Sequence, residues 1–171
     1  MNNKKIYIIL SFSGTFFAIL IRLFTGKEYS HSSIALDKEL NEMYSFGRLK
    51  PYNPFKGGFV HEGIHHGTFN RFKKTKAKIL EIDVSEDDYN KLSDELTNFK
   101  NGVWKYNYLG VLLYPSKKAI RFKNRFYCSE FVKHMLDLTN TNFELPEVVK
   151  PYDFNSIENS NVIYEGILKN Y

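Results

Sequence analysis

The chain has 171 residues, of which 43% are hydrophobic and 16% aromatic, and it contains a single cysteine. This composition excludes intrinsic disorder, and one cysteine excludes an internal disulfide and any site built on a CxxC pair. The formal net charge of +5 is carried mainly by residues 71–78 and 117–125. We interpret both basic runs as solvated surfaces, with contact to an anionic lipid or cell-wall surface as the alternative. Neither run completes a nucleic-acid motif, so we expect no nucleic-acid partner.

The first apolar segment, residues 6–25, follows two lysines and is long enough for a signal peptide or an anchor helix. Its centre reads SFSGT, a turn-like cluster that divides the segment in two. The first half is short and rich in β-branched and aromatic residues, which predicts a buried strand. The second half runs from Thr15 to Gly26 and predicts a short buried helix. We therefore expect a cytoplasmic protein, with export or anchoring as the alternative.

The next elements are extended. Two strands are predicted at residues 30–37 and 40–48, joined by a tight turn around Lys38. The proline- and glycine-rich residues 49–67 are predicted to form a surface loop with short extended pieces. Another strand is predicted at residues 76–84.

Two helices follow. Residues 85–102 form the clearer one, because Ser85 can cap its start, acidic residues fill its first turn and Gly102 ends it. The second begins at or near Cys128, since the apolar residues after it recur at helical spacing. The tail predicts a helical turn and a last strand. Without repeats or linkers, we expect one α+β domain spanning residues 1–171.

Residues 61–65 match H-E-x-x-H, the signature of zinc peptidases. In those enzymes the two histidines face one way because they lie four apart on a helix. Here four glycines fall within eleven residues, and each costs on the order of 1 kcal/mol in a helix interior. A third ligand is also required, and none stands at a motif spacing. We interpret the match as coincidental and expect no metal ion and no cofactor.

Cys128 is the alternative centre of chemistry. A thiolate is nucleophilic, and a helix N-terminus lowers the pKa of a thiol from about 8.5. The partner must be a histidine that accepts its proton. His134 lies on the same helix and points away, three histidines lie in the glycine-rich segment, and His31 opens a strand between small serines. We predict the pair His31 and Cys128. Taken singly, each residue also has a purely structural interpretation. His31 would be a hydrogen-bonded histidine at a strand edge, and Cys128 a small buried apolar residue.

The segments KEYSHSSIAL and NRFYCSEFVKHML, in this order, resemble the circularly permuted branch of the NlpC-type papain-like cysteine peptidases, the YiiX/YebB-like group. In that branch the histidine strand precedes the cysteine helix. The segments GVWKYNY and VKPYDF match in order as well, so the resemblance covers nearly the whole chain. It implies a permuted papain-like fold, with an antiparallel sheet packed against helices and the nucleophile at a helix N-terminus. It also implies a thiol hydrolase that cleaves a peptide-like amide or an ester through a Cys-His dyad and an acyl-enzyme.

The resemblance assigns roles to single residues. Cys128 would attack a carbonyl group, its backbone N–H would contribute to the oxyanion site, and His31 would transfer the proton. Tyr106 matches a tyrosine near the cleft of such proteins and would donate to the oxyanion or contact the substrate.

The residue that orients the imidazole is less evident. Relatives carry a polar or acidic residue on the strand after the histidine strand, and here that strand reads EMYSFGR. Ser45 is the nearest polar match, with Tyr44 and Glu62 as alternatives.

Two other functions stay open. A lipid-directed acyltransferase or hydrolase of the same fold is one, because the apolar residues 16–24 and 108–115 lie near basic runs and would line a groove for an acyl substrate. The alternative interpretation is that both segments are buried in the hydrophobic core. A binding module that keeps the fold without catalysis is the other, and the missing acid is its best support.

Overall fold

The computed structural model of the chain describes all residues except 1–2, 15–17, 20–21, 23–25 and 114–118. The helix expected between Thr15 and Gly26 falls largely on residues outside this description. Among the residues that are described, no helix combines the length and the apolar character that crossing a membrane requires.

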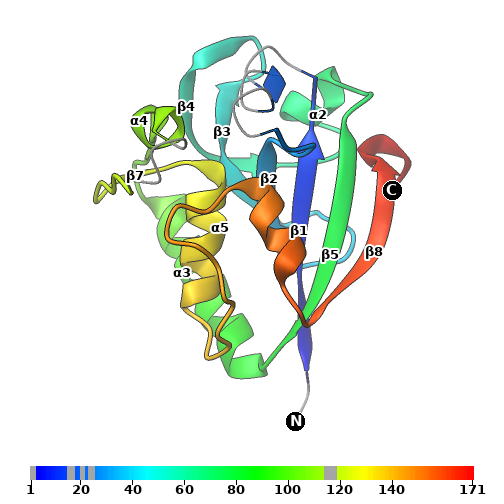
Figure 1. Cartoon of the computed structure of the whole chain (residues 1–171), viewed down its shortest axis with the longest axis vertical. Helices are drawn as coiled ribbons and strands as arrows, with labels where there is room; N and C mark the ends of the chain where they lie inside the picture. The colour runs from blue at the N-terminus through cyan, green and yellow to red at the C-terminus, as the bar shows by residue number, and fades with distance from the viewer. Residues whose placement is uncertain (1–2, 15–17, 20–21, 23–25, 114–118) are drawn as a thin grey trace.

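One antiparallel sheet organises the described residues. Its strands are β1 (Lys4–Phe12), β2 (His31–Ala35), β3 (Met43–Lys50), β4 (Asn53–Glu62), β5 (Lys76–Val84) and β8 (Ser160–Ile167). They pair in the order β4-β3-β2-β1-β5-β8, and every neighbouring pair is antiparallel. Figure 1 shows β1 and β2 near the middle of the sheet and the C-terminal strand β8 at its edge. The strands predicted before residue 49, at residues 76–84 and in the tail are therefore confirmed.

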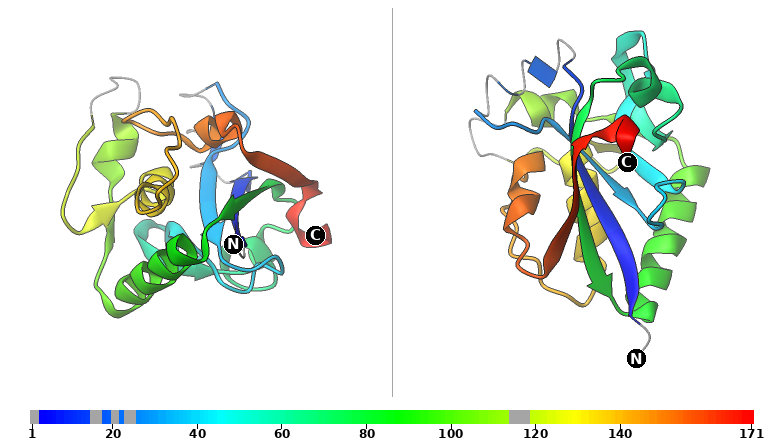
Figure 2. Two further views of the ribbon diagram at one scale, coloured as in Figure 1. Left: turned by 90° about the horizontal axis from the view of Figure 1, so that it is seen from below. Right: turned by 90° about the vertical axis from the view of Figure 1, so that its right-hand side faces the viewer.

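Helices cover both faces of this sheet. The elements are α2 (Gly67–Arg71), α3 (Glu86–Asn101), α4 (Tyr108–Leu112), α5 (Cys128–Asp137) and two 3-10 turns, η2 (Pro151–Ser156) and η3 (Leu168–Asn170). A short parallel pair, β6 (Lys105–Tyr106) and β7 (Arg125–Phe126), lies beside β4. Figure 2 shows α3 and α5 together on one side of the sheet. The architecture is α+β with an antiparallel sheet packed against helices, as expected.

Alternation along β1 divides the interior in two, because successive side chains of a strand point to opposite faces. Ile6 and Ile8 enter the larger core with α3 and α5, whereas Tyr7 and Ile9 enter a smaller core that contains Phe69 of α2. In the larger core, aromatic rings join the layers: the centroid of Phe131 lies 5.4 Å from that of Phe46 and 4.9 Å from that of Phe99. This aromatic contact locates α5 against β3 and α3.

Both predicted helices form where local signals place them. The hydroxyl of Ser85 accepts the backbone N–H of Asp88 at 3.1 Å, which caps α3, and the apolar stripe of α3 packs into the larger core. Gly102 is the C-cap. The helix α5 begins at Cys128 itself, and its apolar face is buried.

The expectation of a loop at residues 49–67 is wrong, because β3 and β4 form a hairpin there and α2 follows. Gly57 and Gly58 lie inside β4 and allow another segment of the chain to approach this strand closely. A side chain at Gly57 would bring its Cβ to 2.8 Å from the Cβ of Tyr106, and one at Gly58 would meet the carbonyl oxygen of Trp104 at 2.7 Å. Glycine inside a strand often marks such an approach, and here it admits the segment that carries Tyr106.

Candidate active site

Cys128 is the first residue of α5 and is 2% exposed. The start of this helix is held from two sides. The carboxylate of Glu130 accepts the backbone N–H of Tyr127 and the side-chain amide of Asn107, both at 3.2 Å. The hydroxyl of Ser129 donates to the carbonyl oxygen of Val149 at 2.8 Å. These bonds fix the position of the thiol at the positive end of the helix dipole.

His31 is the first residue of β2, and α5 packs against this strand. The register of β1 and β2 pairs His31 with Ser11, close to the end of β1. There the imidazole is hydrogen-bonded with the thiol of Cys128, and the backbone of Ser32 is hydrogen-bonded to the same sulfur. The structure therefore brings together the two residues that the sequence predicted as a pair.

Glu62, the last residue of β4, is the second partner of the imidazole. Its Oε1 and Oε2 lie 3.0 Å and 3.3 Å from Nε2 of His31, and its Oε2 accepts the hydroxyl of Ser33. Only 9% of the Glu62 side chain and 22% of the His31 side chain are exposed. Because Nε2 faces the carboxylate, Nδ1 is the ring nitrogen left for the thiol.

The three groups shift one another's proton affinities. Burial alone would lower the pKa of His31, but the negative charge of Glu62 and the hydrogen bonds with Cys128 and Glu62 raise it to about 10. Burial alone would raise the pKa of Cys128, yet the hydrogen bond and charge of His31, with backbone groups of Ser32 and Ser129, lower it. Burial likewise opposes ionisation of Glu62, and His31 with the serines lowers its pKa. The arrangement favours a thiolate, an imidazolium and a carboxylate at neutral pH.

Tyr106 ends the short strand β6 and is partly buried beside the thiol. Its pKa is raised well above 10, first by burial and then by the charge of Cys128, with which it is hydrogen-bonded. A tyrosine in this state keeps its proton and acts as a donor. The ring of Tyr108 lies next to it, with centroids 4.8 Å apart.

Ser45 lies on β3, fully buried, and the structure does not place it against His31. Within the described residues its hydroxyl makes no hydrogen bond of good geometry, although it lies near enough to Glu62 to help lower the pKa of that carboxylate. Glu62 holds the position beside the imidazole instead. An ideal Cβ at Gly47 would stand 3.5 Å from Oε1 of Glu62, so the small residues of β3 leave room for the carboxylate.

The H-E-x-x-H match does not form a helix. His61 and Glu62 end β4, and Gly63–His66 is a turn closed by an isolated bridge. Adjacent strand residues face opposite sides, so His61 stacks on Tyr44 with centroids 4.8 Å apart while Glu62 turns to His31. No group of three or more His, Cys, Asp or Glu side chains in the described part of the chain is arranged to hold a metal ion.

Two supporting residues were missed from the sequence, Asn107 and Glu130. Asn107 is buried, caps α4 by accepting the backbone N–H of Gly110 at 2.9 Å, and donates to Glu130. It follows Tyr106 directly, so it holds that tyrosine near the start of α5. Glu130 stands three residues after Tyr127, which is the spacing at which an acid satisfies the N–H at a helix start. His134, by contrast, pairs with Glu95 at 2.8 Å, away from the thiol.

The described site therefore holds a buried thiol, an imidazole hydrogen-bonded with it, a carboxylate on the other side of that ring and a tyrosine hydroxyl that keeps its proton. Comparison with protein-family models, with curated proteins and with solved structures found no match.

Proposed function

We propose that the protein is a cysteine hydrolase of the permuted papain-like, NlpC-type group, which cleaves a peptide-like amide or an ester through an acyl-enzyme. The observation that carries this proposal is the position of His31, hydrogen-bonded on one side with Cys128 and on the other with Glu62. A nucleophile, a base and a group that orients the base are the parts that acyl transfer by a thiol requires.

In the first step the thiolate of Cys128 attacks the substrate carbonyl carbon, and the carbonyl oxygen becomes an oxyanion. The backbone N–H of Cys128 and the hydroxyl of Tyr106 are the donors available to it. The imidazolium of His31 then protonates the leaving nitrogen or oxygen as the bond to the carbonyl carbon breaks, which leaves a thioester on Cys128.

In the second step His31, now neutral, takes a proton from water, and the water oxygen attacks the thioester. The carbon–sulfur bond breaks, the carboxylic acid product leaves, and the thiolate–imidazolium pair is restored. Glu62 stays ionised throughout; it keeps the ring oriented and stabilises its positive charge. Glu62 is thus a positioning residue and Cys128 and His31 are the catalytic residues.

The order of the elements supports the group assignment. The histidine strand β2 precedes the cysteine helix α5, the segment with Tyr106 lies between them, and an antiparallel sheet packs against α3 and α5. This order agrees with the sequence segments on which the resemblance rests. The acid that β3 lacks is supplied by Glu62 of β4, which removes the main argument for a binding module without catalysis.

A lipid-directed acyl hydrolase or acyltransferase is the second candidate. It is favoured by Leu109 and Leu112 of α4, which are exposed next to the segment of Tyr106 and offer an apolar contact for an acyl chain. The other apolar segment, residues 16–24, lies largely outside the described residues.

The decisive experiment measures the rate of Cys128 alkylation by iodoacetamide against pH in the wild type and in His31→Ala. We expect an apparent thiol pKa well below 8.5 in the wild type and a value nearer 8.5 in the variant. A thiol that titrates alike in both proteins, or is inert in both, would contradict the proposal. Hydrolysis of p-nitrophenyl esters and of amides with short and long acyl chains then separates the two candidates.

A further inference from the structure

Exposed apolar side chains gather on the β3–β4 hairpin. The exposed fraction is 46% for Leu49 near the end of β3, 78% for Tyr52 in the turn and 79% for Phe55 near the start of β4. The helix α4 lies beside β4, since the hydroxyl of Tyr108 is 3.0 Å from the position of a Cβ at Gly57, and Leu109 and Leu112 of this helix are exposed as well. Isolated apolar residues on a surface need no explanation, but a group of this size marks an interaction site.

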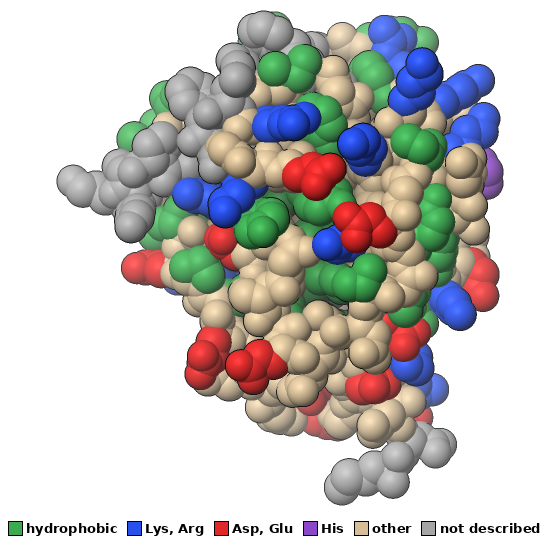
Figure 3. Space-filling model, turned by 45° about the vertical axis from the view of Figure 1, so that its right-hand side comes forward, with side chains coloured by type: hydrophobic (Ala, Val, Ile, Leu, Met, Phe, Trp, Pro, Cys, Tyr) green, Lys and Arg blue, Asp and Glu red, His purple; other side chains and the backbone are tan. Residues whose placement is uncertain are grey.

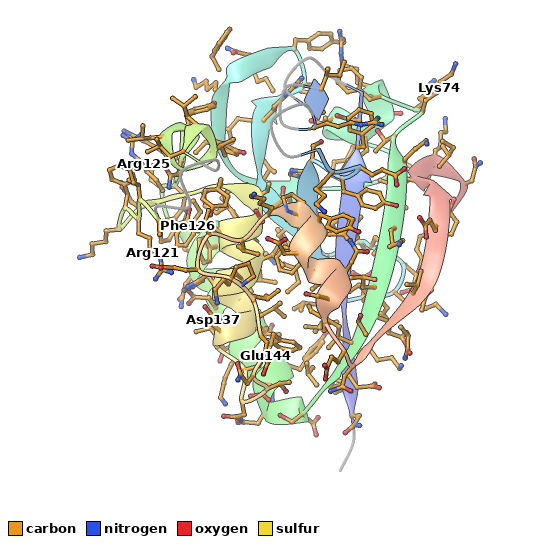
Figure 4. All side chains as sticks on the ribbon, in the orientation of Figure 1. Lys74, Arg121, Arg125, Phe126, Asp137 and Glu144 are labelled. Carbon is orange, nitrogen blue, oxygen red and sulfur yellow. The ribbon has the colours of Figure 1, made fainter. Side chains whose placement is uncertain are left out.

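The same region is strongly basic. Residues 47–74 hold six basic side chains: Arg48, Lys50, Lys56, Arg71, Lys73 and Lys74. The only acidic residue in this range is Glu62, whose carboxylate is hydrogen-bonded with His31. None of the six makes an ion pair with a described carboxylate, whereas basic residues elsewhere on the sheet and helices do. In Figure 3 the Lys and Arg side chains gather toward the upper end of the visible face, and in Figure 4 Lys74 projects outward there.

Arginine and aromatic groups are interleaved at the turn of the hairpin. The guanidinium of Arg71 lies 3.9 Å from the ring centroid of Tyr52 and 5.5 Å from that of Phe72, and the guanidinium of Arg48 lies 5.9 Å from Phe72. Two arginines thus share one aromatic neighbour without a carboxylate between them. Like charges held close together repel, and an anionic group placed against them would relieve that repulsion.

We propose that this surface, the hairpin of residues 48–56 with α4 and the basic residues 71–74, docks the protein on an anionic phospholipid bilayer. The aromatic and leucine side chains would enter the interfacial layer, where amphipathic rings are favoured, and the lysines and arginines would contact phosphate groups. In Figure 1 the hairpin lies at the top, and the start of β2 and the N-terminus of α5 lie below it in the upper half of the molecule. Docking through the hairpin would therefore turn the half of the molecule that contains Cys128 toward the bilayer.

The charges and the apolar groups together favour a bilayer over another anionic partner. A purely polyanionic partner, such as polyglutamate or the backbone of a DNA duplex, would neutralise the six cations but leave the side chains of Tyr52, Phe55 and Leu112 in water. A bilayer interface accepts both kinds of group at once. The inference does not rest on catalysis, because docking is measured on the full chain without any substrate.

The test is co-sedimentation of the full chain with vesicles. We expect binding to vesicles of phosphatidylcholine with phosphatidylglycerol, little binding to phosphatidylcholine alone, and a loss of about tenfold or more between low and high salt. The triple variant Arg71→Gln, Lys73→Gln, Lys74→Gln should bind about tenfold more weakly or worse. The variant Tyr52→Ser, Phe55→Ser should lose binding while keeping its charge.

A matched control removes three charges outside this surface: Lys4→Gln, Lys38→Gln and Lys91→Gln. These positions lie at the start of β1, in the turn after β2 and on α3. This variant should bind as the wild type does, and circular dichroism checks the fold of all variants. Three results would overturn the proposal: no binding of the wild type to anionic vesicles, an equal loss in the control, or polyglutamate binding as strong as vesicle binding and indifferent to Tyr52 and Phe55.

Discussion

Nε2 of His31 lies 3.0 Å from Oε1 of Glu62, although the two residues belong to strands separated by β3. This contact gives the imidazole a fixed ring orientation and a charge partner, and the thiol of Cys128 is its other neighbour. Orientation of a base by an acid on its far side is the arrangement that prepares a histidine for proton transfer. The reactivity of Cys128 should consequently depend on a residue that does not touch it.

Glu62→Gln tests that dependence. The amide keeps a similar shape but removes the negative charge, so the imidazolium loses stabilisation and the apparent pKa of Cys128 should rise by roughly one unit. The measurement is iodoacetamide alkylation against pH. Glu95→Gln is the matched control, because it breaks the Glu95–His134 pair, which is built in the same way at 2.8 Å. An equal shift in both variants would show that the effect is not specific to the site.

The stability of the fold should depend on the protonation of His31. Its folded pKa, about 10, lies above the ordinary value of 6.5. A raised pKa contributes stability that is fully present below the unfolded value and is lost as the pH rises through the folded value. With Cys128→Ser in both proteins, so that no thiol titrates beside the ring, the difference in free energy of unfolding between the chain with His31 and the chain with His31→Gln should therefore shrink from pH 6.5 to above pH 10. Urea denaturation at fixed pH values measures it, and a difference independent of pH would contradict the ion pair.

Tyr106→Phe removes the hydroxyl that is hydrogen-bonded with Cys128. If this hydroxyl donates to the oxyanion, kcat for ester hydrolysis should fall by about 10²-fold while KM changes little, as for the loss of one oxyanion donor. Tyr108→Phe is the comparison, since its hydroxyl faces the backbone of Gly57. A loss confined to KM would instead assign Tyr106 to substrate binding.

Gly57→Ala probes the contact between β4 and β6. The added methyl would lie 2.8 Å from the Cβ of Tyr106, so one strand must move, at a cost of about 1–3 kcal/mol in the free energy of unfolding. Thermal or urea unfolding measures this cost. Gly47→Ala meets its nearest neighbour at 3.4 Å, so a smaller loss is expected there. Equal stability of the two variants would show that the close approach is not strictly required.

Elements built on local interactions were predictable from the sequence. The helix α3 has its cap, its acidic first turn and its apolar stripe within one short segment, and each of these forms as predicted. The strands β1 and β5 follow from their buried residues and are paired with each other in the sheet. The position of Cys128 at the start of α5 follows from the spacing of the apolar residues after it. In each case the interactions that decide the element join residues close in the chain.

The third group of the site and the hairpin depended on tertiary structure. The glycines of residues 57–58 indicate a loop when only neighbours along the chain are considered, but they make room for Trp104 and Tyr106. Once β4 is a strand, its alternation turns Glu62 toward His31 and His61 toward Tyr44. Sequence alone predicted the cysteine, the helix that it begins and the histidine beside it. The order and register of the strands decided which carboxylate reaches the imidazole, because that contact joins strands that are not neighbours.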